Sequence, residues 1–323
     1  MTIHRYRQIN DVHLSDQPPA GRTASYLDDI LTKLDWAVTV PSSTSAIVIT
    51  GDLLHRKNAA HTTHRTVQRI RDVLTMGVPV YIVPGNHDEA HGGGLDGQPL
   101  LSVVDGRRIR LLTGACYTDP LIAGVPWSNA FEGEDGVAAF ARACDVGRPL
   151  IFAHAPISDR PFPFGPEARG WMLDFDVLAA LPEYVRLVGH GHMHGRQPIV
   201  YGRAVLSNPG ALSRASLSTD DVARAPMVAD IEYDDATGEV QVRYVAVPHR
   251  PAAEVLRLER HAREARRDGT VEALAAHLGS AEAEVVDADT MRAHLQSLTR
   301  PEDVSPDLWQ QGIGLASAAL DGV

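Results

Sequence analysis

The apolar run Val78-Pro79-Val80-Tyr81-Ile82-Val83 leads directly into Pro84-Gly85-Asn86-His87-Asp88, and this junction decides the fold. The run is rich in β-branched and aromatic residues and is closed by Pro-Gly, which predicts a buried strand that ends abruptly. In an open α/β sheet, ligand-binding loops follow the carboxyl ends of the strands. Asn86 offers a neutral oxygen ligand, and His87 titrates near neutral pH and can transfer a proton. Taken alone, the stretch fits an ordinary polar turn equally well, so its meaning depends on the other strand ends.

Four other predicted strands end in side chains of the same kind. In chain order, the candidates are Asp11 and His13 after residues 3–10, Asp52 after residues 46–50, His154 after residues 149–153, and His190, His192 and His194 after residues 184–188. Each residue by itself is better explained as a capping or surface residue. Because five strand ends carry ligand-type side chains, we expect one shared site along the carboxyl edge of the strands.

The spacing of apolar residues predicts how these strands are connected. Helical periodicity indicates amphipathic helices over about 24–40 and 61–76, each between two strands. This alternation is typical of the α/β class with parallel, doubly wound strands. Residues 198–247 predict short antiparallel strands with one solvated face. Beyond them the pattern becomes helical, so we expect a catalytic domain over 1–249 and a helical C-terminal extension over 250–323.

Charge bounds the classes of partner. The chain has 323 residues and a formal net charge of −11 at pH 7, and Lys33 and Lys57 are its only lysines. An acidic chain is a poor default binder of nucleic acid, because that affinity rests largely on the neutralisation of phosphates. Bound divalent cations would nevertheless create a strong local positive charge. The global charge therefore does not settle whether the substrate is a nucleic acid.

Composition also bounds the cellular setting. No apolar run approaches the ~18 residues needed to cross a bilayer, and residues 1–10 lack the apolar core of a signal peptide. We therefore expect a cytoplasmic protein without membrane contact. Cys116 and Cys144 are the only cysteines, which excludes a disulfide framework and a cysteine zinc cluster. The arginines of residues 257–267 alternate with glutamates, which favours a solvated helix face over a nucleic-acid patch.

The donor types at the strand ends indicate metal chemistry. Carboxylate, amide and imidazole without thiolate suit manganese, iron or zinc, and suit two ions bridged by one carboxylate. Two such ions about 3.5–4 Å apart clamp the attacking and leaving oxygens of a phosphoryl displacement. They also lower the pKa of water, which supplies hydroxide at neutral pH. We expect two divalent ions, with Mn²⁺ as the leading candidate and iron or zinc as alternatives.

The order of these motifs resembles that of the calcineurin-like metallophosphoesterase superfamily. Asp-x-His, Gly-Asp, Gly-Asn-His-Asp, a lone His and Gly-His-x-His follow one another over about residues 11–194. The resemblance implies an αββα sandwich around a site for two metal ions. By motif, it makes Asp11 and His13 ligands of the first ion and Asp52 the bridging carboxylate. It likewise makes Asn86 and His154 ligands of the second ion, and His87 the group that protonates the leaving oxygen.

Within the superfamily, the chain is most similar to the SbcD-like DNA repair nucleases and their phage-type members. Many relatives place Asp three residues after the bridging carboxylate, whereas this chain reads GDLLH and places His55 there, as the nuclease branch does. In that branch this histidine is thought to help position the phosphate. The segments DVHLSDQPPAGR at 11–22 and NPGALSRASL at 208–217 also resemble phage-type members. The resemblance implies DNA as substrate and an SbcC-type coiled-coil ATPase as partner, and it leaves room for a homodimer.

Two alternatives remain open at this point. In the first, the same site belongs to a phosphodiesterase or phosphatase that acts on a small molecule such as a cyclic nucleotide. In the second, the chain is an interaction module that kept the fold and lost the chemistry. The register of the last motif is also open, because Gly189-His190-Gly191-His192 and Gly191-His192-Met193-His194 both fit Gly-His-x-His. Residues two apart in an extended chain point the same way, so geometry alone does not choose between His190 and His194. The first register follows the predicted strand 184–188 without a gap, whereas the second is supported by Gln197, three residues after His194 as in the repair nucleases. His192 belongs to both registers.

Overall fold

The computed structural model describes residues 2–55, 62–89, 94–158 and 172–258. Contacts between Cα atoms separate a compact unit, Met1–Arg257, from Leu258–Val323. The fold described below is that of the first unit, and residues 259–323, which include most of the predicted helical extension, lie outside the described part of the chain.

The first sheet confirms the predicted parallel strands. Its order within the described residues is β11-β10-β1-β2-β3-β4. The strands are β1 (Ile3–Ile9), β2 (Ala46–Thr50), β3 (Val80–Val83), β4 (Ile109–Leu111), β10 (Met227–Asp234) and β11 (Val240–Ala246). Strands β1 to β4 pair in parallel, so their carboxyl ends share one edge. Strands β10 and β11 add an antiparallel margin beside β1, as the alternating pattern predicts.

The second sheet supplies the remaining strand ends. Its order within the described residues is β5-β6-β7-β9-β8. The strands are β5 (Ile122–Val125), β6 (Leu150–His154), β7 (Leu187–Gly191), β8 (Val200–Tyr201) and β9 (Val205–Ser207). All but β8 run in parallel. The ends of β5, β6 and β7 therefore also lie along one edge.

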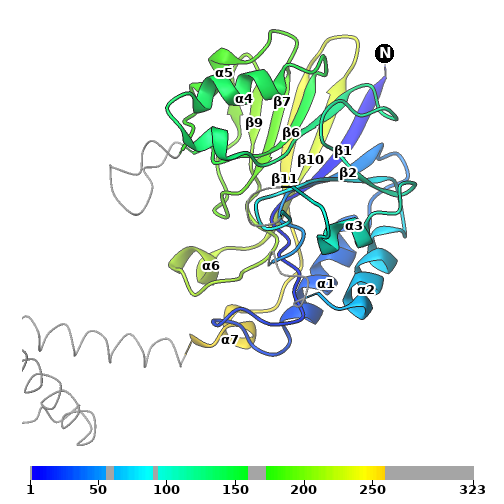
Figure 1. The fold of residues 1–323 in the computed structure, drawn as a ribbon, viewed down its shortest axis with the longest axis vertical. Coiled ribbons are helices and arrows are strands. Elements are labelled where there is room, and N and C mark those ends of the chain that lie inside the picture. The colour runs from blue at the N-terminus through cyan, green and yellow to red at the C-terminus, as the bar shows by residue number, and fades with distance from the viewer. Residues whose placement is uncertain (1, 56–61, 90–93, 159–171, 259–323) are drawn as a thin grey trace, which may run out of the picture. The chain divides into compact units, whose positions relative to one another are not determined.

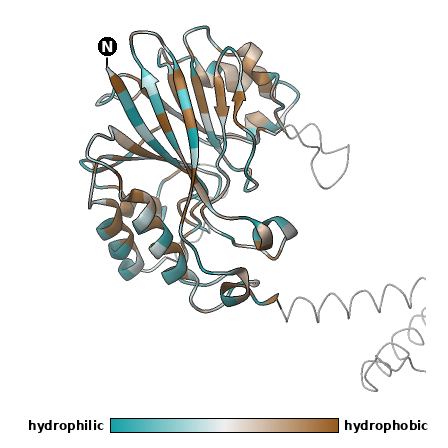
Figure 2. Cartoon of the chain, turned by 180° about the vertical axis from the view of Figure 1, so that it is seen from behind, coloured by the Kyte–Doolittle hydropathy of each residue, from teal (hydrophilic) through white to brown (hydrophobic). Residues whose placement is uncertain are grey.

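Helices cover the outer face of each sheet (Figure 1). The first sheet carries α1 (Tyr26–Val38), α2 (His64–Leu74) and α3 (Pro99–Val103). The second carries η2 (Asn129–Glu132), α4 (Gly136–Cys144) and α5 (Val177–Ala180). Two short helices, α6 (Thr219–Ala223) and α7 (Ala252–Val255), lie on later connections. In Figure 2, hydrophilic and hydrophobic residues both occur along α1 and α2, as expected for helices with one buried side.

Three hydrophobic clusters fill the spaces between these layers. One lies between α1–α3 and the first sheet, one between the two sheets, and one between the second sheet and α4–α5. The order helix, sheet, sheet, helix is the αββα sandwich that the sequence resemblance implies. Each Å² of apolar surface removed from water stabilises the folded state by ~25 cal/mol, so these three interfaces contribute most of the stability of the fold.

The strand that carries the last histidine motif begins later than its sequence predicts. Residues 182–185 form a turn in which the N–H of Val185 donates to the carbonyl of Pro182 at 3.1 Å. Strand β7 then runs through Gly189, His190 and Gly191. His190 is therefore a strand residue, and only His192 and His194 follow the strand end.

Residues 250–257 are still part of the first unit. The bridge Arg22–Leu256 is antiparallel, and the N–H of Arg257 donates to the carbonyl of Gly21 at 2.9 Å. Val255 and Leu256 are buried. The boundary between 249 and 250 stays a prediction. In the described part of the chain, no helix is long and apolar enough to cross a membrane.

Candidate metal centre

The predicted ligands meet where the carboxyl ends of the two sheets face each other. They come from β1 (Asp11, His13), β2 (Asp52), β3 (Asn86), β6 (His154) and β7 (His192, His194), each at or just beyond the strand end. Donor atoms of Asp11, His13 and His194 lie within 4.8 Å of one another, as do those of Asp11, Asp52 and His154. The structure thus brings distant parts of the chain into one cluster. For example, the backbone N–H of His192 donates to Asp11, which lies more than 180 positions earlier in the sequence.

Backbone conformation singles out the same residues. Among the described non-glycine residues, positive φ angles occur at Asp11 (47°), His13 (54°), Asp52 (49°) and His192 (87°). Asp and His tolerate this region better than most residues, yet such conformations still cost about 1–3 kcal/mol each. Strain that is confined to a cluster of donors is typical of a functional site, because the surrounding fold must hold the backbone in that conformation.

One half of the cluster is built around His13. Its Nε2 lies 3.0 Å from Nε2 of His194 and 3.8 Å from Oδ2 of Asp52. The hydroxyl of Tyr26, on α1, donates to the His13 carbonyl at 2.7 Å and fixes the strained backbone there. With Asp11, whose donor atom lies within 4.8 Å of those of His13 and His194, two imidazoles and two carboxylates converge here, a donor set that suits a divalent cation.

The other half is built around Asn86. Its Oδ1 lies 3.0 Å from Nε2 of His154 and 3.2 Å from Nδ1 of His192. Nδ1 of His154 donates to the carbonyl of Thr50 at 2.9 Å, which turns Nε2 toward the cluster. Such a contact at the far nitrogen is how proteins orient a metal-binding histidine. Oδ2 of Asp52 lies 3.5 Å from Nε2 of His154, so the same carboxylate oxygen adjoins both halves.

The electrostatics of the cluster favour bound cations. Asp11 and Asp52 are buried, and among the described residues only histidines pair with them, with no lysine or arginine within ion-pair distance. Burial raises the pKa of Asp11. Burial also opposes ionisation of Asp52, but the neighbouring histidines, His154 first, hold its pKa well below the usual range. Buried carboxylates without a fixed cation are costly, and divalent ions would supply the missing charge. The oxygen and nitrogen donors fit manganese, iron or zinc.

His87 and His55 lie beside the His13 half. The backbone N–H of His87 donates to Oδ1 of Asp52 at 2.8 Å, and Nδ1 of His87 donates to the His55 carbonyl at 2.6 Å. The two imidazoles stack with centroids 5.9 Å apart. The His87 ring meets the edge of His13 at a centroid distance of 5.0 Å. His87 is held through its Nδ1 and backbone, which leaves Nε2 for proton transfer.

The structure places the three histidines of the last motif in different positions. Along β7, Leu187 packs between the sheets and Val188 packs on the outer helices, so Gly189 and Gly191 point inward and His190 points outward. A Cβ on Gly191 would lie 2.1 Å from the Thr50 carbonyl oxygen, so only glycine fits at this inward position. The His190 side chain is completely buried. The cluster receives His192 and His194.

Sequence reasoning missed Asp88 as a member of the site. Its buried carboxylate accepts the backbone N–H groups of Leu53, Leu54 and Gly85 at 3.3, 3.0 and 3.0 Å. Asp88 thereby ties the loop after β2 to the loop after β3. Burial, and next the charge of Asp52, raises its pKa to about 7. Its position in Gly-Asn-His-Asp could have indicated this role, but the motif predicted functions only for Asn86 and His87.

A buried amide network behind the cluster was also missed. The amide nitrogen of Asn10 donates to the His190 carbonyl at 2.6 Å and to Oδ1 of Asn208 at 2.9 Å. Asn208 in turn donates to the carbonyl of Met193 at 2.9 Å. The Asn-Pro-Gly turn at 208–210 therefore braces the segment that presents His192 and His194.

Trp127 is a further residue that sequence reasoning missed. It follows β5, and its ring lies 4.6 Å from the His192 ring with an interplanar angle of 30°. The ring of His154 is 6.0 Å away. The backbone N–H of Trp127 donates to the Pro84 carbonyl at 3.1 Å, which holds it beside the β3 end. A single aromatic residue after a short strand gave no usable signal in the sequence.

Comparison with protein families gives a match that covers more than half of the chain. A family described as calcineurin-like phosphoesterase matches residues 4–196. A search of curated proteins found no match.

Solved structures are similar at low identity. A putative 5′-nucleotidase from Staphylococcus aureus is 13% identical, with a TM-score of 0.47 over 77% of this chain and 55% of that one. A purple acid phosphatase from yellow lupin (Lupinus luteus) is 13% identical, with a TM-score of 0.39 over 76% and 54%. The nuclease MPE from Pseudomonas putida is 17% identical, with a TM-score of 0.33 over 69% and 83%. The chain thus spans about half the length of the first two, and these similarities do not bear on its substrate.

Proposed function

The chain belongs to the calcineurin-like phosphoesterase family, and from this premise we propose that it is a metal-dependent DNA exonuclease or endonuclease of the SbcD type. The observation that carries the proposal is the convergence of five strand ends on Asp52, whose Oδ2 lies 3.8 Å from Nε2 of His13 and 3.5 Å from Nε2 of His154. A carboxylate in this position can bridge two ions.

Each half of the cluster would hold one divalent ion. Asp11, His13 and His194 would hold the first, Asn86, His154 and His192 the second, and Asp52 would bridge them. When bound, the two ions polarise the phosphoryl oxygens and lower the pKa of water. We propose Mn²⁺ as the metal, because the oxygen and nitrogen donors without thiolate suit it; iron and zinc fit the same donors.

The remaining steps fall to side chains of the chain itself. His87 would donate a proton from Nε2 to the leaving oxygen, because its Nδ1 and backbone N–H are already engaged by His55 and Asp52. His55, stacked on His87, would orient the phosphodiester between them. The buried walls of the site would exclude bulk water and strengthen these interactions.

DNA is proposed as the substrate because His55 occupies the position where the nuclease branch also has histidine. The structure supports a role for it, since donor atoms of His13, His55 and His87 lie within 4.8 Å of one another. The net charge of −11 favours the alternative, a phosphodiesterase or phosphatase that acts on a small molecule such as a cyclic nucleotide.

Parallel assays of the purified protein test the proposal. With Mn²⁺ we expect cleavage of duplex or single-stranded DNA, loss of cleavage with a chelator, and about two metal ions per chain by elemental analysis. A His87→Asn variant purified in the same way controls for contaminating nucleases. Hydrolysis of cyclic nucleotides without DNA cleavage would select the small-molecule alternative. Absence of both metal and hydrolysis would leave only a binding module.

A further inference from the structure

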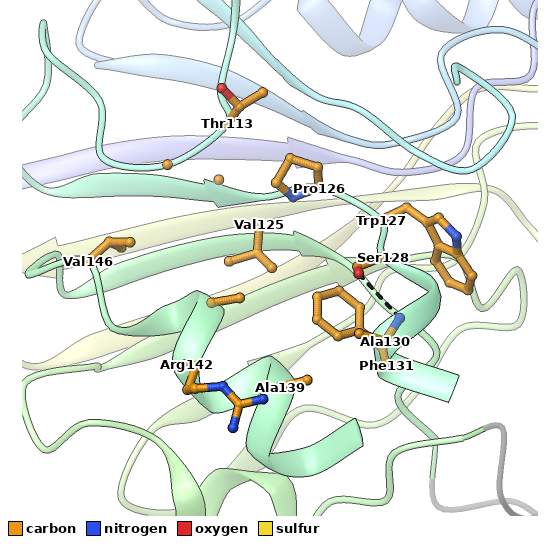
Figure 3. Close-up of a pocket in the computed structure, with 13 residues that line it drawn as sticks. Thr113, Val125, Pro126, Trp127, Ser128, Ala130, Phe131, Ala139, Arg142 and Val146 are labelled. Carbon is orange, nitrogen blue, oxygen red and sulfur yellow. Dashed lines mark hydrogen bonds between the residues drawn. The ribbon is translucent and has the colours of Figure 1, made fainter. Parts of the chain in front are cut away.

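A cavity of about 420 Å³ has Trp127 in its wall, and the ring of Trp127 contacts the ring of His192 in the metal centre. Figure 3 shows it between the segment that follows β5 and helix α4, with Trp127 at one end. Val125, Pro126 and Phe131 give it apolar surface, and Arg142 of α4 lines it as well. Its volume lies within the range of roughly 300–1,000 Å³ that is usual for small-molecule sites.

Trp127 joins this cavity to the metal centre. Strands β5 and β6 are parallel and Val125 pairs with Ala153, so Trp127 leaves the sheet at the same edge as His154. Its ring is half-buried, and it lies 4.6 Å from the ring of His192. The indole N–H donates to Oδ1 of Asn129 at 3.1 Å, which fixes the ring plane. An aromatic face held rigidly beside a reacting phosphate is a stacking surface for another flat ring.

Arg142 adds a polar group to the same cavity. Its side chain is exposed and lines the cavity, so its guanidinium can donate to a ligand there. A flat, mostly apolar ligand with carbonyl or ring-nitrogen acceptors matches an indole, a phenyl ring and a guanidinium. Nucleobases have this chemistry, and their stacking on aromatic side chains tolerates any base.

From these features we infer that Trp127 and the adjoining cavity form a subsite for the nucleobase on the retained side of the scissile phosphodiester. The inference rests on the proposed phosphodiesterase function. It concerns the retained side because His87, the proposed acid, lies against His13, whereas Trp127 lies against His192. The leaving oxygen departs toward the acid, so the group near Trp127 is the one that stays on phosphorus.

Two chromogenic substrates isolate this interaction. In thymidine 5′-(p-nitrophenyl phosphate) and methyl p-nitrophenyl phosphate, the oxygen of water bonds to phosphorus and p-nitrophenolate leaves. The products are thymidine 5′-monophosphate and methyl phosphate, so only the first keeps a base on the retained side. For Trp127→Ala we expect the ratio of kcat/KM for the thymidine ester to that for the methyl ester to fall about tenfold or more.

Further variants separate stacking from support of His192. Trp127→Phe keeps an aromatic face and should restore most of the ratio. Tyr117→Ala, which removes a fully exposed aromatic side chain (103% relative exposure), is the matched control and should leave the ratio unchanged. Calorimetric binding of thymidine 5′-monophosphate, compared with methyl phosphate, should show the same loss in Trp127→Ala without turnover. An equal fall for both esters, with metal loss, would mean that Trp127 only supports His192 and would overturn the inference.

A DNA strand with one abasic residue distinguishes the source of the base. If natural DNA is preferred over the abasic strand and Trp127→Ala removes that preference, the subsite serves polynucleotides. If the effect is confined to the thymidine ester, the subsite serves mononucleotides. If Trp127→Ala changes neither preference, the subsite does not exist. Failure of the wild-type protein to cleave any DNA would refute the proposed nuclease while the ester ratio still tests the subsite.

Discussion

The backbone N–H of His87 donates to Oδ1 of Asp52 at 2.8 Å. The proposed acid and the proposed bridging carboxylate are therefore fixed to each other by one short contact between two strand ends. Oδ2 of the same carboxylate faces His13 and His154. The position of His87 relative to both halves of the centre thus depends on Asp52. The His87 side chain itself is not one of the proposed metal ligands.

His87→Asn should separate proton transfer from metal binding. Removing a general acid typically lowers the rate by about two to four orders of magnitude. The Asp52 contact uses the backbone, so the variant should keep it and retain metal content close to wild type. Hydrolysis of a phosphodiester and elemental analysis of the same preparation check both expectations. Loss of metal together with activity would show that His87 is a ligand.

Asp52→Asn should weaken metal binding rather than catalysis alone. A neutral amide cannot bridge two cations as a carboxylate does, so at least one ion should be lost or bound much more weakly. The amide oxygen can still accept the His87 N–H, which preserves the loop geometry. Elemental analysis and metal titration measure the effect. Two fully occupied sites in this variant would remove Asp52 from the bridging role.

Alanine substitutions should resolve the register of the last motif. His192→Ala and His194→Ala should each lose metal, because both side chains reach the cluster. His190→Ala should keep both ions, since β7 directs this side chain to its outer face. The His190 variant removes a completely buried ring and should lose stability, so His190→Gln serves as a less disruptive companion. Metal loss in both His190 variants, with retention in His194→Ala, would select the first register.

The sequence predicted the topology because its signals are local. Strand, helix and strand-end residues such as Asp11 and Asp52 follow from apolar spacing and from the turn that closes each strand. The choice between His190 and His194 could not be predicted, because it depends on where β7 ends. The turn at Pro182–Val185 delays the start of β7, and the strand then runs on to Gly191, which approaches the Thr50 carbonyl closely.

Other features were hidden because they depend on contacts between distant segments. The carboxylate of Asp88 acquires its role from N–H groups of Leu53 and Leu54, more than thirty residues earlier in the chain. Trp127 matters only because β5 lies beside β6 in the second sheet. Neither relation has a spacing that a single sequence reveals. Burial and sheet order, rather than residue type, turn these side chains into parts of a site.

A buried lysine outside the metal centre provides a test of the fold. Lys33 on α1 is 1% exposed, and its Nζ lies 3.2 Å from Oδ2 of Asp29, which also pairs with Arg22 at 2.6 Å. Burial lowers the pKa of Lys33 to about 8, although Asp29 opposes this shift. The folded state therefore holds the Lys33 proton less tightly than the unfolded chain, in which a lysine pKa is about 10.4.

Lys33→Met should therefore stabilise the protein at neutral pH and change its pH dependence. Between about pH 8 and pH 10.4 the unfolded wild-type chain binds more protons at this position, so the free energy of unfolding gains a component that rises with pH. Methionine removes that component, and at pH 7 it should add up to ~3 kcal/mol because the cost of burying the ammonium disappears. Asp29 keeps its partner Arg22 in the variant. Urea unfolding at several pH values measures both effects, with Arg65→Gln on the exposed side of α2 as the control. A variant less stable than wild type at pH 7, with the same pH slope, would show that the Lys33–Asp29 pair is net stabilising.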